Sequence, residues 1–587
     1  MGKYAWEPYG KYLYHSRVRK FMDAHGIKTA EELIARSVSD INWFWSSAMD
    51  FLGVEWFRRF HTLYDDSKGM PWTKWFLGGK TNITHNCLDR HVERGWGGNT
   101  ALIFERDNGT SYRVTYATLH NLVKKLARAM KLYGIKKGDR IAMCMPISPE
   151  AVAVMLAAFK IGAVCMQPAS RISAHEIVES ILPGAPKLFF MNDGYERAGK
   201  VIKLDETFHE VRRRVCSDIV VFQRFWKSFE HENAARYASW DSFVWQNGHH
   251  NFPQTEALDA EHPALILYSS GTTGKSKIII HTHGGILAQV PKEIGLAFDC
   301  RENDVFYWFT NIGWMMAPWE IIGALFFGAT VVLYEGTHLY PSAHRMFELI
   351  KKHKITIFGF TPSAMIDLAG IGEDFSHHDL SSLRILGSTG KVFHPKIWEW
   401  YSQTFGKGRL PIMNISGGTE IIGCLVSPLP VMPQNPGTVG GPGLGMDVDV
   451  VDENGSPARG SPGYLVCKKP APSMTRGFLG ENERYLETYF PWGHNLWVHG
   501  DIAEIGELTS EAIAAMRQWV GKTYDPLARP DEIHVVSGLP INLAAKVLLR
   551  LVRMAYAGEM IADVSKIINP QFLEEIRALG ERMRQKS

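Results

Sequence analysis

A run of small, hydroxylated and basic residues between two apolar segments is the part of the sequence best suited to chemistry. It occupies residues 268–277 (YSSGTTGKSK) and follows the apolar residues Ala264–Leu267. Glycines let backbone N–H groups approach a phosphate, hydroxyl groups donate further hydrogen bonds, and lysines neutralise the charge. We therefore predict a phosphate-binding loop that uses Ser269, Ser270, Gly271, Thr272, Thr273, Gly274, Lys275 and Lys277.

Two kinds of phosphate-binding loop fit these residue types, and the segment that follows separates them. The Walker pattern G-x-x-x-x-G-K-[ST] is nearly matched by residues 269–276, but Ser269 stands where the first glycine belongs. A Walker lysine also opens a helix. Here Lys277 begins a β-branched run, residues 277–283 (KIIIHTH), that is typical of a strand. The context disfavours a Walker ATPase.

The same run resembles the nucleotide loop of the adenylate-forming (ANL) superfamily, which includes acyl-CoA synthetases, adenylation domains and luciferases. In that superfamily a Ser/Thr/Gly run ends in Gly-x-x-Lys and a strand follows. Residues 414–420 (NISGGTE) and 497–501 (WVHGD) resemble two further motifs, in the family's order. The resemblance implies that Thr419 contacts the α-phosphate of ATP, that Glu420 holds Mg²⁺ and that Asp501 binds the ribose hydroxyls.

A further stretch, residues 387–392 (GSTGKV), resembles the loop that lines the adenine side of the site and includes Gly390. Relatives usually have Glu-Pro where Lys391 and Val392 stand, so the charge there is reversed. In the implied reaction a carboxylate attacks the α-phosphorus of ATP and pyrophosphate leaves. Two anions must meet, so Mg²⁺, lysine and backbone dipoles are needed to spread the developing charge. The residues implied to be catalytic are Thr272, Lys277, Glu420 and Lys546.

Residues 75–82 (WFLGGKTN) and 86–91 (NCLDRH) are similar to the entry segment of acetyl-, propionyl- and acetoacetyl-CoA synthetases. Enzymes for acetate carry Trp-Gln before the Thr-Glu pair, whereas this chain has Gly417 and Gly418. Without the indole there is space for a longer acid, so we expect a short- to medium-chain substrate whose pocket also includes Trp314. Residues 195–200 (YERAGK) resemble the family's CoA-phosphate site, which implies that Arg197 and Lys200 bind coenzyme A.

The sequence departs from the family after Asp501. Relatives continue through a Gly-Arg-x-Asp-Asp hinge into a small C-terminal domain that rotates for the second half-reaction. Here residues 501–505 (DIAEI) pass directly into 507–511 (ELTSE), and residues 528–540 resemble only the end of that domain. The hinge and the first half of the domain are therefore expected to be absent. The family's closing Ser-Gly-Lys reads Ala-Ala-Lys546.

The elements that must position these motifs follow a βα pattern. Apolar residues at helical spacing predict a helix from about 116 to 130, and Ser148-Pro149-Glu150 is a typical helix start. Strands are expected at residues 140–145, 162–167, 265–268, 277–281, 330–334, 383–386 and 448–451. The last should run into a hairpin turn at 452–455, and helices are expected at 510–520 and 569–584. Alternation of this kind predicts α/β architecture with parallel sheet.

The composition points to a globular chain. Of 587 residues, 45% are hydrophobic and 21% charged, and 64 Lys+Arg against 61 Asp+Glu give a net charge of +3. No nucleic-acid or membrane partner is indicated. Seven dispersed cysteines without a Cys-x-x-Cys pair argue against disulfides and zinc sites, and predict reduced thiols in the cytoplasm. The longest apolar stretch, about 321–334, is too short to cross a bilayer, and the N-terminus does not resemble a signal peptide.

The resemblance implies an ANL-type large domain, with two βα-rich subdomains and a distorted β-barrel, and a reduced α+β C-terminal lobe. We expect an N-terminal extension (1–110) packed on the large AMP-binding domain (111–505), a truncated lobe (506–560) and an amphipathic helix (561–587). The implied function is an ATP-dependent, AMP-forming acyl-CoA synthetase that uses a carboxylic acid, ATP, Mg²⁺ and coenzyme A. The chain could act as a homo-oligomer or together with a partner subunit. The alternative is a non-enzymatic or adenylation-only descendant that binds a nucleotide or acyl ligand.

Overall fold

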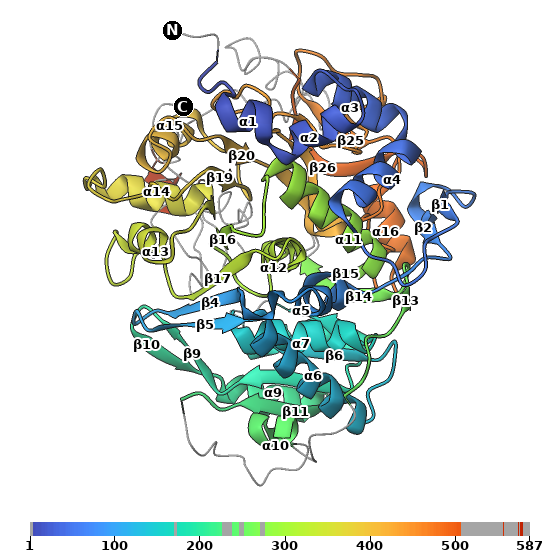
Figure 1. Ribbon diagram of the computed structural model, residues 1–587, viewed down its shortest axis with the longest axis vertical. Helices are drawn as coiled ribbons and strands as arrows, with labels where there is room; N and C mark the ends of the chain where they lie inside the picture. The colour runs from blue at the N-terminus through green and yellow to red at the C-terminus, as the bar shows by residue number, and fades with distance from the viewer. Residues whose placement is uncertain are drawn as a thin grey trace. The chain divides into compact units, whose positions relative to one another are not determined.

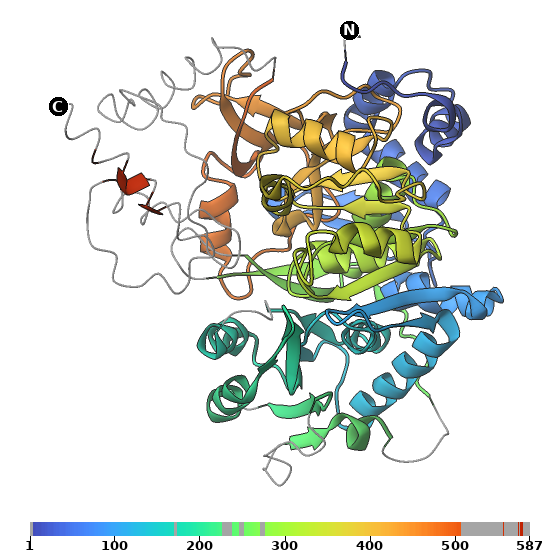
Figure 2. The same ribbon diagram turned by 90° about the vertical axis from the view of Figure 1, so that its left-hand side faces the viewer.

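The structure is a computed structural model that describes residues 4–168, 173–215, 217–225, 237–245, 252–269 and 276–505, with Tyr556, Leu573, Glu574, 576–578 and Glu581 (Figures 1 and 2). These residues divide into two compact units. The first is drawn from Met1–Ser269, Ser276–Asp449 and Leu465–Gly500, and the second from Ser270–Lys275, Val450–Tyr464 and Asp501–Ser587. Each unit is considered by itself.

One sheet of the first unit has seven strands within the described residues, in the order β12-β11-β8-β6-β7-β14-β15. The neighbouring strands are parallel except β14 and β15, which are antiparallel at the edge. The predicted parallel sheet is confirmed, but the 277–281 strand returns beside β14 instead of crossing over. The bounds are β6 (Arg140–Cys144), β7 (Val164–Met166), β8 (Leu188–Asn192), β11 (Asp218–Phe222), β12 (Tyr237–Ser239), β14 (Pro263–Ser269) and β15 (Lys277–Thr282).

Helices cover both faces of this sheet because its strands carry buried apolar residues on both sides. On β8, Phe189 and Met191 belong to a buried cluster with apolar residues of α8 and α9. Phe190 points the other way and packs 5.6 Å from Phe243 of α10. The predicted start of α7 is confirmed, since the Ser148 hydroxyl accepts the Ala151 N–H at 3.2 Å. The helices are α6 (Tyr116–Leu132), α7 (Pro149–Lys160), α8 (Ala174–Ile181), α9 (Asp205–Arg214) and α10 (Trp240–Trp245).

A second sheet in the same unit has the described strand order β20-β19-β18-β16-β17-β4-β5. Its strands are parallel except for the β4–β5 hairpin. Phe347 of α13 and Phe405, just after α15, stack 4.5 Å apart, and Phe405 contacts Phe358 of β18. The elements are β4 (Thr100–Arg106), β5 (Ser111–Thr115), β16 (Val305–Trp308), β17 (Thr330–Glu335), β18 (Ile357–Gly359), β19 (Ile385–Ser388), β20 (Ile412–Asn414), α11 (His283–Lys292), α12 (Met316–Phe326), α13 (Arg345–His353), α14 (Pro362–Ile371) and α15 (Pro395–Thr404).

The N-terminal helices contact residues far along the chain. The Tyr12 hydroxyl donates to the Arg384 carbonyl at 2.6 Å, and the Arg17 N–H donates to Asp299 at 2.7 Å. Trp45 and Trp75 are both fully buried, with ring centroids 6.3 Å apart. The elements are α1 (Gly10–His15), α2 (Arg17–Ala24), α3 (Ala30–Ser39), α4 (Ile41–Leu52), β1 (Thr62–Asp65), β2 (Lys74–Leu77), β3 (Lys80–Thr81), η2 (His85–Asp89) and α5 (Arg90–Glu93).

The predicted hairpin turn after β24 (Val448–Val451) is confirmed within the second unit. The Gly455 N–H donates to the Asp452 carbonyl at 3.0 Å, and the Asp452 N–H donates to Ser456 at 2.8 Å. In the same unit the Gly460 N–H donates to the Ile505 carbonyl at 3.1 Å. The helix expected at 510–520 lies outside the described residues. Of the one expected at 569–584, Leu573, Glu574, 576–578 and Glu581 are described and are helical.

The cysteines agree with the prediction of free thiols. The six described cysteines are buried and form no disulfide bonds with one another: Cys87, Cys144, Cys165, Cys300, Cys424 and Cys467. Cys216 lies outside the described residues. In the described parts of the chain, no helix combines the length and the apolar character that crossing a membrane requires.

Candidate active site

Glu420 lies on a short 3-10 turn, η6 (Thr419–Ile421), between the antiparallel strands β21 (Ser416–Gly418) and β22 (Gly423–Ser427). Its backbone is held on both sides. The His281 ring donates from Nε2 to the Thr419 carbonyl at 2.7 Å, and the Thr475 N–H donates to the Glu420 carbonyl at 2.8 Å. The Glu420 side chain is therefore presented from a fixed turn and is buried.

Three side chains from distant segments converge on the Glu420 carboxylate. The Ser269 hydroxyl, at the end of β14, donates to Oε1 at 3.2 Å. The Lys277 ammonium, at the start of β15, lies 3.5 Å from the same oxygen. The hydroxyl of Tyr489, the last residue of α16 (Asn482–Tyr489), also donates to Oε1 and accepts from Lys277 at 2.8 Å. The structure thus brings together Ser269, Lys277 and Glu420, which the sequence assigned to one site.

The charges around Glu420 favour its ionised form. Burial alone raises a carboxyl pKa, but Lys277, the Tyr489 hydroxyl and His499 outweigh it and lower the pKa of Glu420 below its ordinary value. Burial, followed by the charge of Glu420, raises the pKa of Tyr489, so its hydroxyl stays protonated and remains a donor. Burial lowers the pKa of His281 to about 4. This ring is neutral near pH 7 and carries its proton on Nε2 toward Thr419.

The second oxygen of the Glu420 carboxylate faces a position that has no side chain. A Cβ on Gly418 would lie 2.6 Å from Oε2 and 2.9 Å from Cε1 of His499. Only glycine lets the backbone come this close to Oε2, and the described side-chain donors converge on the other oxygen, Oε1. Oε2 is therefore the oxygen left for a cation, and carboxylate oxygens are ligands that Mg²⁺ prefers. The residues present therefore fit the ion that the family resemblance implies.

Gly417 is required by the close approach of two backbones. A Cβ on Gly417 would come within 2.0 Å of the Gly423 carbonyl oxygen and 2.7 Å of the Cys424 Cα, both on β22. The register pairs Gly417 with Cys424, with an irregularity just before it. The side-chain direction at this position points into the neighbouring strand. The close approach of the β21 and β22 backbones thus explains why position 417 carries no indole. The enlarged acyl pocket expected at Gly417 and Gly418 stays a prediction.

The loop that contains Gly390 lies beside the strand end that leads to Glu420. The Thr389 hydroxyl donates to the Ile415 carbonyl at 2.7 Å, and the Ile415 N–H donates to Ser388 at 3.0 Å. Gly390 has a φ of 98°, in the left-handed region that glycine adopts readily. Burial lowers the pKa of the neighbouring Lys391.

The two basic residues predicted to bind coenzyme A face each other across a tight hairpin. β9 (Gly194–Arg197) and β10 (Lys200–Lys203) are antiparallel, and Arg197 pairs with Lys200 in the register. Between them, Ala198 and Gly199 have φ values of 49° and 74°, and the Gly199 N–H donates to Asp107 at 2.9 Å. Lys200 is exposed. The pair is available to an anion, but no contact in the structure tests that role.

Trp314 and Trp319 differ in exposure. Trp314 is 38% exposed, whereas Trp319 is fully buried and donates from its indole N–H to Glu293 at 2.7 Å. Trp319 is therefore a core residue. Asp501 is exposed on β26 (Trp497–Ala503) and belongs to the second unit. Ser270, Gly271, Thr272, Thr273, Gly274, Lys275 and Lys546 lie outside the described residues, so their predicted roles stay predictions.

Residues 88–479 match the family described as AMP-binding enzyme, and residues 30–87 match the acetyl-coenzyme A synthetase N-terminus. The first match covers more than half of the chain. The chain belongs to the AMP-binding enzyme family. Within it, the N-terminal match confirms the predicted branch of acyl-CoA synthetases and excludes a Walker ATPase.

Relatives of this synthetase support the same placement. An acetyl-coenzyme A synthetase of Thiobacillus denitrificans is 33% identical, with 94% of this chain and 95% of the relative covered. One of Methylobacillus flagellatus is 31% identical, with 96% and 97% covered. The structure of an acetoacetyl-CoA synthetase from Streptomyces lividans superposes with a TM-score of 0.84 at 24% identity, covering 99% of this chain and 100% of that one. At that identity the likeness shows the fold alone, and it confirms the ANL-type architecture.

Two side chains of the synthetase site were missed in the sequence. Tyr489 lies one helical turn after Tyr485 on α16, so its helical spacing was the signal that could have pointed to it. His499 lies inside the recognised motif 497–501 and acts on Glu420 through its charge. Motif reading assigned a role only to the carboxylate of that motif.

Proposed function

We propose that this acyl-CoA synthetase activates a short- to medium-chain carboxylic acid at Glu420 and its neighbours. In the first step a carboxylate oxygen of the acid attacks the α-phosphorus of ATP, an acyl-adenylate forms and pyrophosphate leaves. In the second step the thiol of coenzyme A attacks the acyl carbon, loses its proton and releases AMP. The convergence of Ser269, Lys277 and Tyr489 on the buried Glu420 carboxylate is the observation that carries the proposal.

The residues around Glu420 suit the first step. The ammonium of Lys277 supplies positive charge where two anions must approach, and its hydrogen bond to Tyr489 fixes its direction. The neutral His281 ring holds the Thr419 carbonyl, which orients Thr419 toward the expected α-phosphate. A buried site strengthens each of these electrostatic interactions because little water competes.

Magnesium belongs to the proposal through Glu420. The Oε2 oxygen would hold the ion, which screens the phosphate charges when it is bound. The other oxygen, Oε1, stays bound to the protein donors and keeps the carboxylate oriented. Coenzyme A would use Arg197 and Lys200, which are opposite each other in the β9–β10 register. Buried free thiols favour a reducing compartment such as the cytoplasm.

The function is tested by acid-dependent exchange of pyrophosphate into ATP, over a panel of short- to medium-chain acids. Glu420→Gln should reduce the rate by about 10²-fold or more, because a ligand for the cation and its charge are lost. It should also raise the Mg²⁺ concentration needed for half-maximal exchange. Glu302→Gln, at an exposed position, is the matched control and should behave as the unmodified chain does.

Two outcomes would contradict the proposal. Unchanged exchange and Mg²⁺ dependence in Glu420→Gln would remove Glu420 from the site. No exchange by the unmodified chain with any acid of the panel would reject adenylation. Thermal unfolding of each variant is measured alongside, so a loss of activity is interpreted only for protein that is folded.

A further inference from the structure

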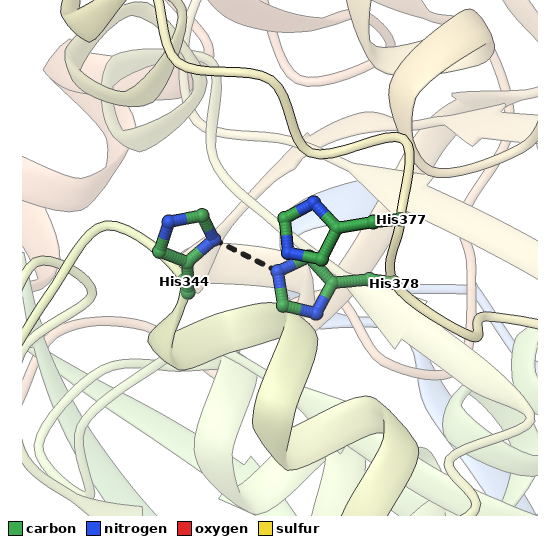
Figure 3. A group of neighbouring side chains, drawn as sticks. All are labelled: His344, His377 and His378. Atoms are coloured by element: carbon green, nitrogen blue, oxygen red, sulfur yellow. Dashed lines mark hydrogen bonds between the residues drawn. The ribbon is translucent and has the colours of Figure 1, made fainter.

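Three histidines gather in the first unit, on segments that supply none of the residues around Glu420. His344 immediately precedes α13, and His377 and His378 lie in the connection between α14 and β19. Their rings turn toward one another (Figure 3). One ligating atom of each lies within 4.8 Å of the others. Imidazole nitrogens grouped in this way are a donor set for a transition metal ion.

A carboxylate fixes the proton on one of these rings. His344 Nε2 lies 2.8 Å from Glu373 Oε2, and His344 Nδ1 lies 2.8 Å from His378 Nε2. A carboxylate only accepts, so Glu373 holds a proton on Nε2 and leaves the lone pair of Nδ1 directed at the cluster. Metal-ligating histidines generally donate their other ring N–H to a carboxylate or carbonyl in this manner.

Aromatic packing positions the rings before any ligand arrives. Phe347 stacks on His378 at 5.0 Å and on Phe375 at 4.5 Å, and Phe375 meets the edge of His344 at 5.3 Å. The turn before His377 is also held, since the Ser376 N–H donates to Asp374 at 2.8 Å. Side chains that packing has already oriented lose little further freedom when they bind a ligand.

We propose that His344, His377 and His378 form a binding site for Zn²⁺ or a similar first-row transition metal ion, with Glu373 orienting His344. Three imidazoles with water in the fourth position give a tetrahedral site. Zn–N distances of about 2.0–2.1 Å place the nitrogens about 3.3 Å apart, so His344 and His378 would separate by about half an ångström. The ring proton that His378 now directs at His344 would move to Nδ1 of His378, so that its Nε2 lone pair faces the ion and the ring stays neutral. The ion would cross-link the start of α13 to the α14–β19 connection.

The site is tested on the full chain, freed of metal with a chelator and titrated with Zn²⁺ against a competing dye. One equivalent should bind to the unmodified chain, and its affinity should fall at least 100-fold in His377→Ala and His378→Ala. His377 is exposed, so its replacement has little structural cost. Glu373→Gln should weaken binding by about 10–100-fold, as expected for a residue that orients a ligand.

His209→Ala, at an exposed position on α9, is the matched control and should bind as the unmodified chain does. Co²⁺ provides a second readout, because a tetrahedral nitrogen site gives visible absorption bands that both histidine variants should lose. Zn²⁺ should raise the melting temperature of the unmodified chain by a few degrees and leave His377→Ala unchanged. Equal binding of the first equivalent by all variants, or no stoichiometric binding, would overturn the site without affecting the proposed adenylation.

Discussion

Glu420 is a buried carboxylate that its neighbours keep ionised. Lys277, Tyr489 and His499 together lower its pKa, although burial opposes them. Its pKa in the folded chain therefore lies below its value in the unfolded chain. The stability it contributes is present above the ordinary glutamate range and is lost as the pH falls through the folded-state pKa. The affinity of Glu420 for a metal ion should fall over the same pH range, because the ion binds the ionised carboxylate.

Tyr489→Phe tests how much the Tyr489 hydroxyl contributes to the lowered pKa of Glu420. The change removes a hydrogen bond to the Glu420 carboxylate, so the pKa of Glu420 should rise toward its ordinary value. The acid limb of the pyrophosphate-exchange profile should then move to higher pH. The ratio of the rate at acidic pH to the rate at neutral pH should fall severalfold. The measurement is the exchange rate as a function of pH at saturating Mg²⁺.

Tyr485→Phe is the matched control because it lies one turn earlier on α16. Its hydroxyl donates to the Thr475 carbonyl at 3.3 Å and does not contact Glu420. Its profile should keep the acid limb of the unmodified chain. An acid limb that does not move in Tyr489→Phe would show that this hydroxyl does not stabilise the carboxylate in solution.

The sequence identified the members of this site that stand in short motifs. Ser269 and Lys277 flank a phosphate-type loop, and Glu420 ends a recognisable motif, so residue types and order were enough. Tyr489 lies 69 residues beyond Glu420 and 212 beyond Lys277, and tyrosines have many structural uses. Its role follows only from the approach of α16 to the β14–β15 edge, which a local pattern does not encode.

At the scale of elements, the β21–β22 pair depends on a glycine. Gly417→Ala should destabilise the fold, because its Cβ would meet the Gly423 carbonyl at 2.0 Å, and the backbone of β22 must shift. Overpacking of this kind costs about 1–3 kcal/mol. We expect a lower melting temperature together with reduced exchange activity, since Glu420 lies on η6, which directly follows β21. Tryptophan at this position should be tolerated even less.

Gly441→Ala is the control for this prediction. Gly441 lies on β23 (Gly441–Pro442), which pairs with β22, and a Cβ there meets nothing within 4 Å. Its melting temperature should stay within about a degree of that of the unmodified chain. Equal stability of the two variants would contradict the close approach at Gly417.

A buried ion pair joins η2 to the end of α7. Lys160 Nζ lies 3.1 Å from both Asp89 oxygens, and both side chains are about 5% exposed. Burial opposes ionisation of Asp89, but hydrogen bonds from His120, Thr255 and Lys160 and the charge of Lys160 lower its pKa to about 2. The stability from this shift is present above about pH 4 and is lost as the pH falls toward about 2.

Lys160→Met should destabilise the chain by about 3–5 kcal/mol, because the buried Asp89 carboxylate loses its ammonium partner and keeps the hydrogen bonds of His120 and Thr255. Urea unfolding followed by circular dichroism measures the change. Lys131→Met is the control: Lys131 pairs with Glu256 at 3.0 Å, and both are more than one-third exposed. Exposed pairs contribute about 0–1 kcal/mol. Similar losses in both variants would contradict a special role for burial.

The elements with a strong local pattern were predicted well. α6, α7, β6, β14 and β24 begin or end within a few residues of expectation, because caps, apolar periods and β-branched runs are encoded locally. β19 begins at Ile385, two residues after the expected start. The antiparallel return of β15 was missed, since strand direction depends on which edge of the sheet is free. The β4–β5 hairpin was missed although residues 107–109 (DNG) carry a local turn signal, with Gly109 at a φ of 86°.

At the scale of the whole molecule, the two half-reactions place different demands on the chain. In the proposed function, adenylation uses the residues around Glu420, which belong to the first unit. In the family, thioester formation also needs a small domain that rotates about a hinge. The alignment with the Thiobacillus denitrificans relative runs over 638 residues, whereas this chain has 587, so the relative carries segments without a counterpart here. The sequence departure after Asp501 is consistent with such a segment.

We therefore expect adenylate formation to exceed thioester formation by far more than in a relative that has the hinge. Without it, the thiol of coenzyme A would not meet a correctly closed adenylate, and losses of positioning can cost several kcal/mol. Pyrophosphate exchange measures the first step, and release of AMP that depends on coenzyme A measures both. The Thiobacillus denitrificans relative, assayed with the same acids, is the control.

Lys546→Ala tests whether the shortened C-terminal lobe takes part in adenylation, apart from any part it has in thioester formation. If the loop of Lys546 reaches the active site, the variant should lose exchange activity, as the family resemblance implies for this lysine. Lys522→Ala, earlier in the same expected lobe, is the control and should retain exchange. Rapid turnover with coenzyme A by the purified chain would contradict the hinge argument. If that turnover per chain rose with protein concentration, another copy of the chain would support thioester formation. If it did not change with protein concentration, another element of the same chain would do so.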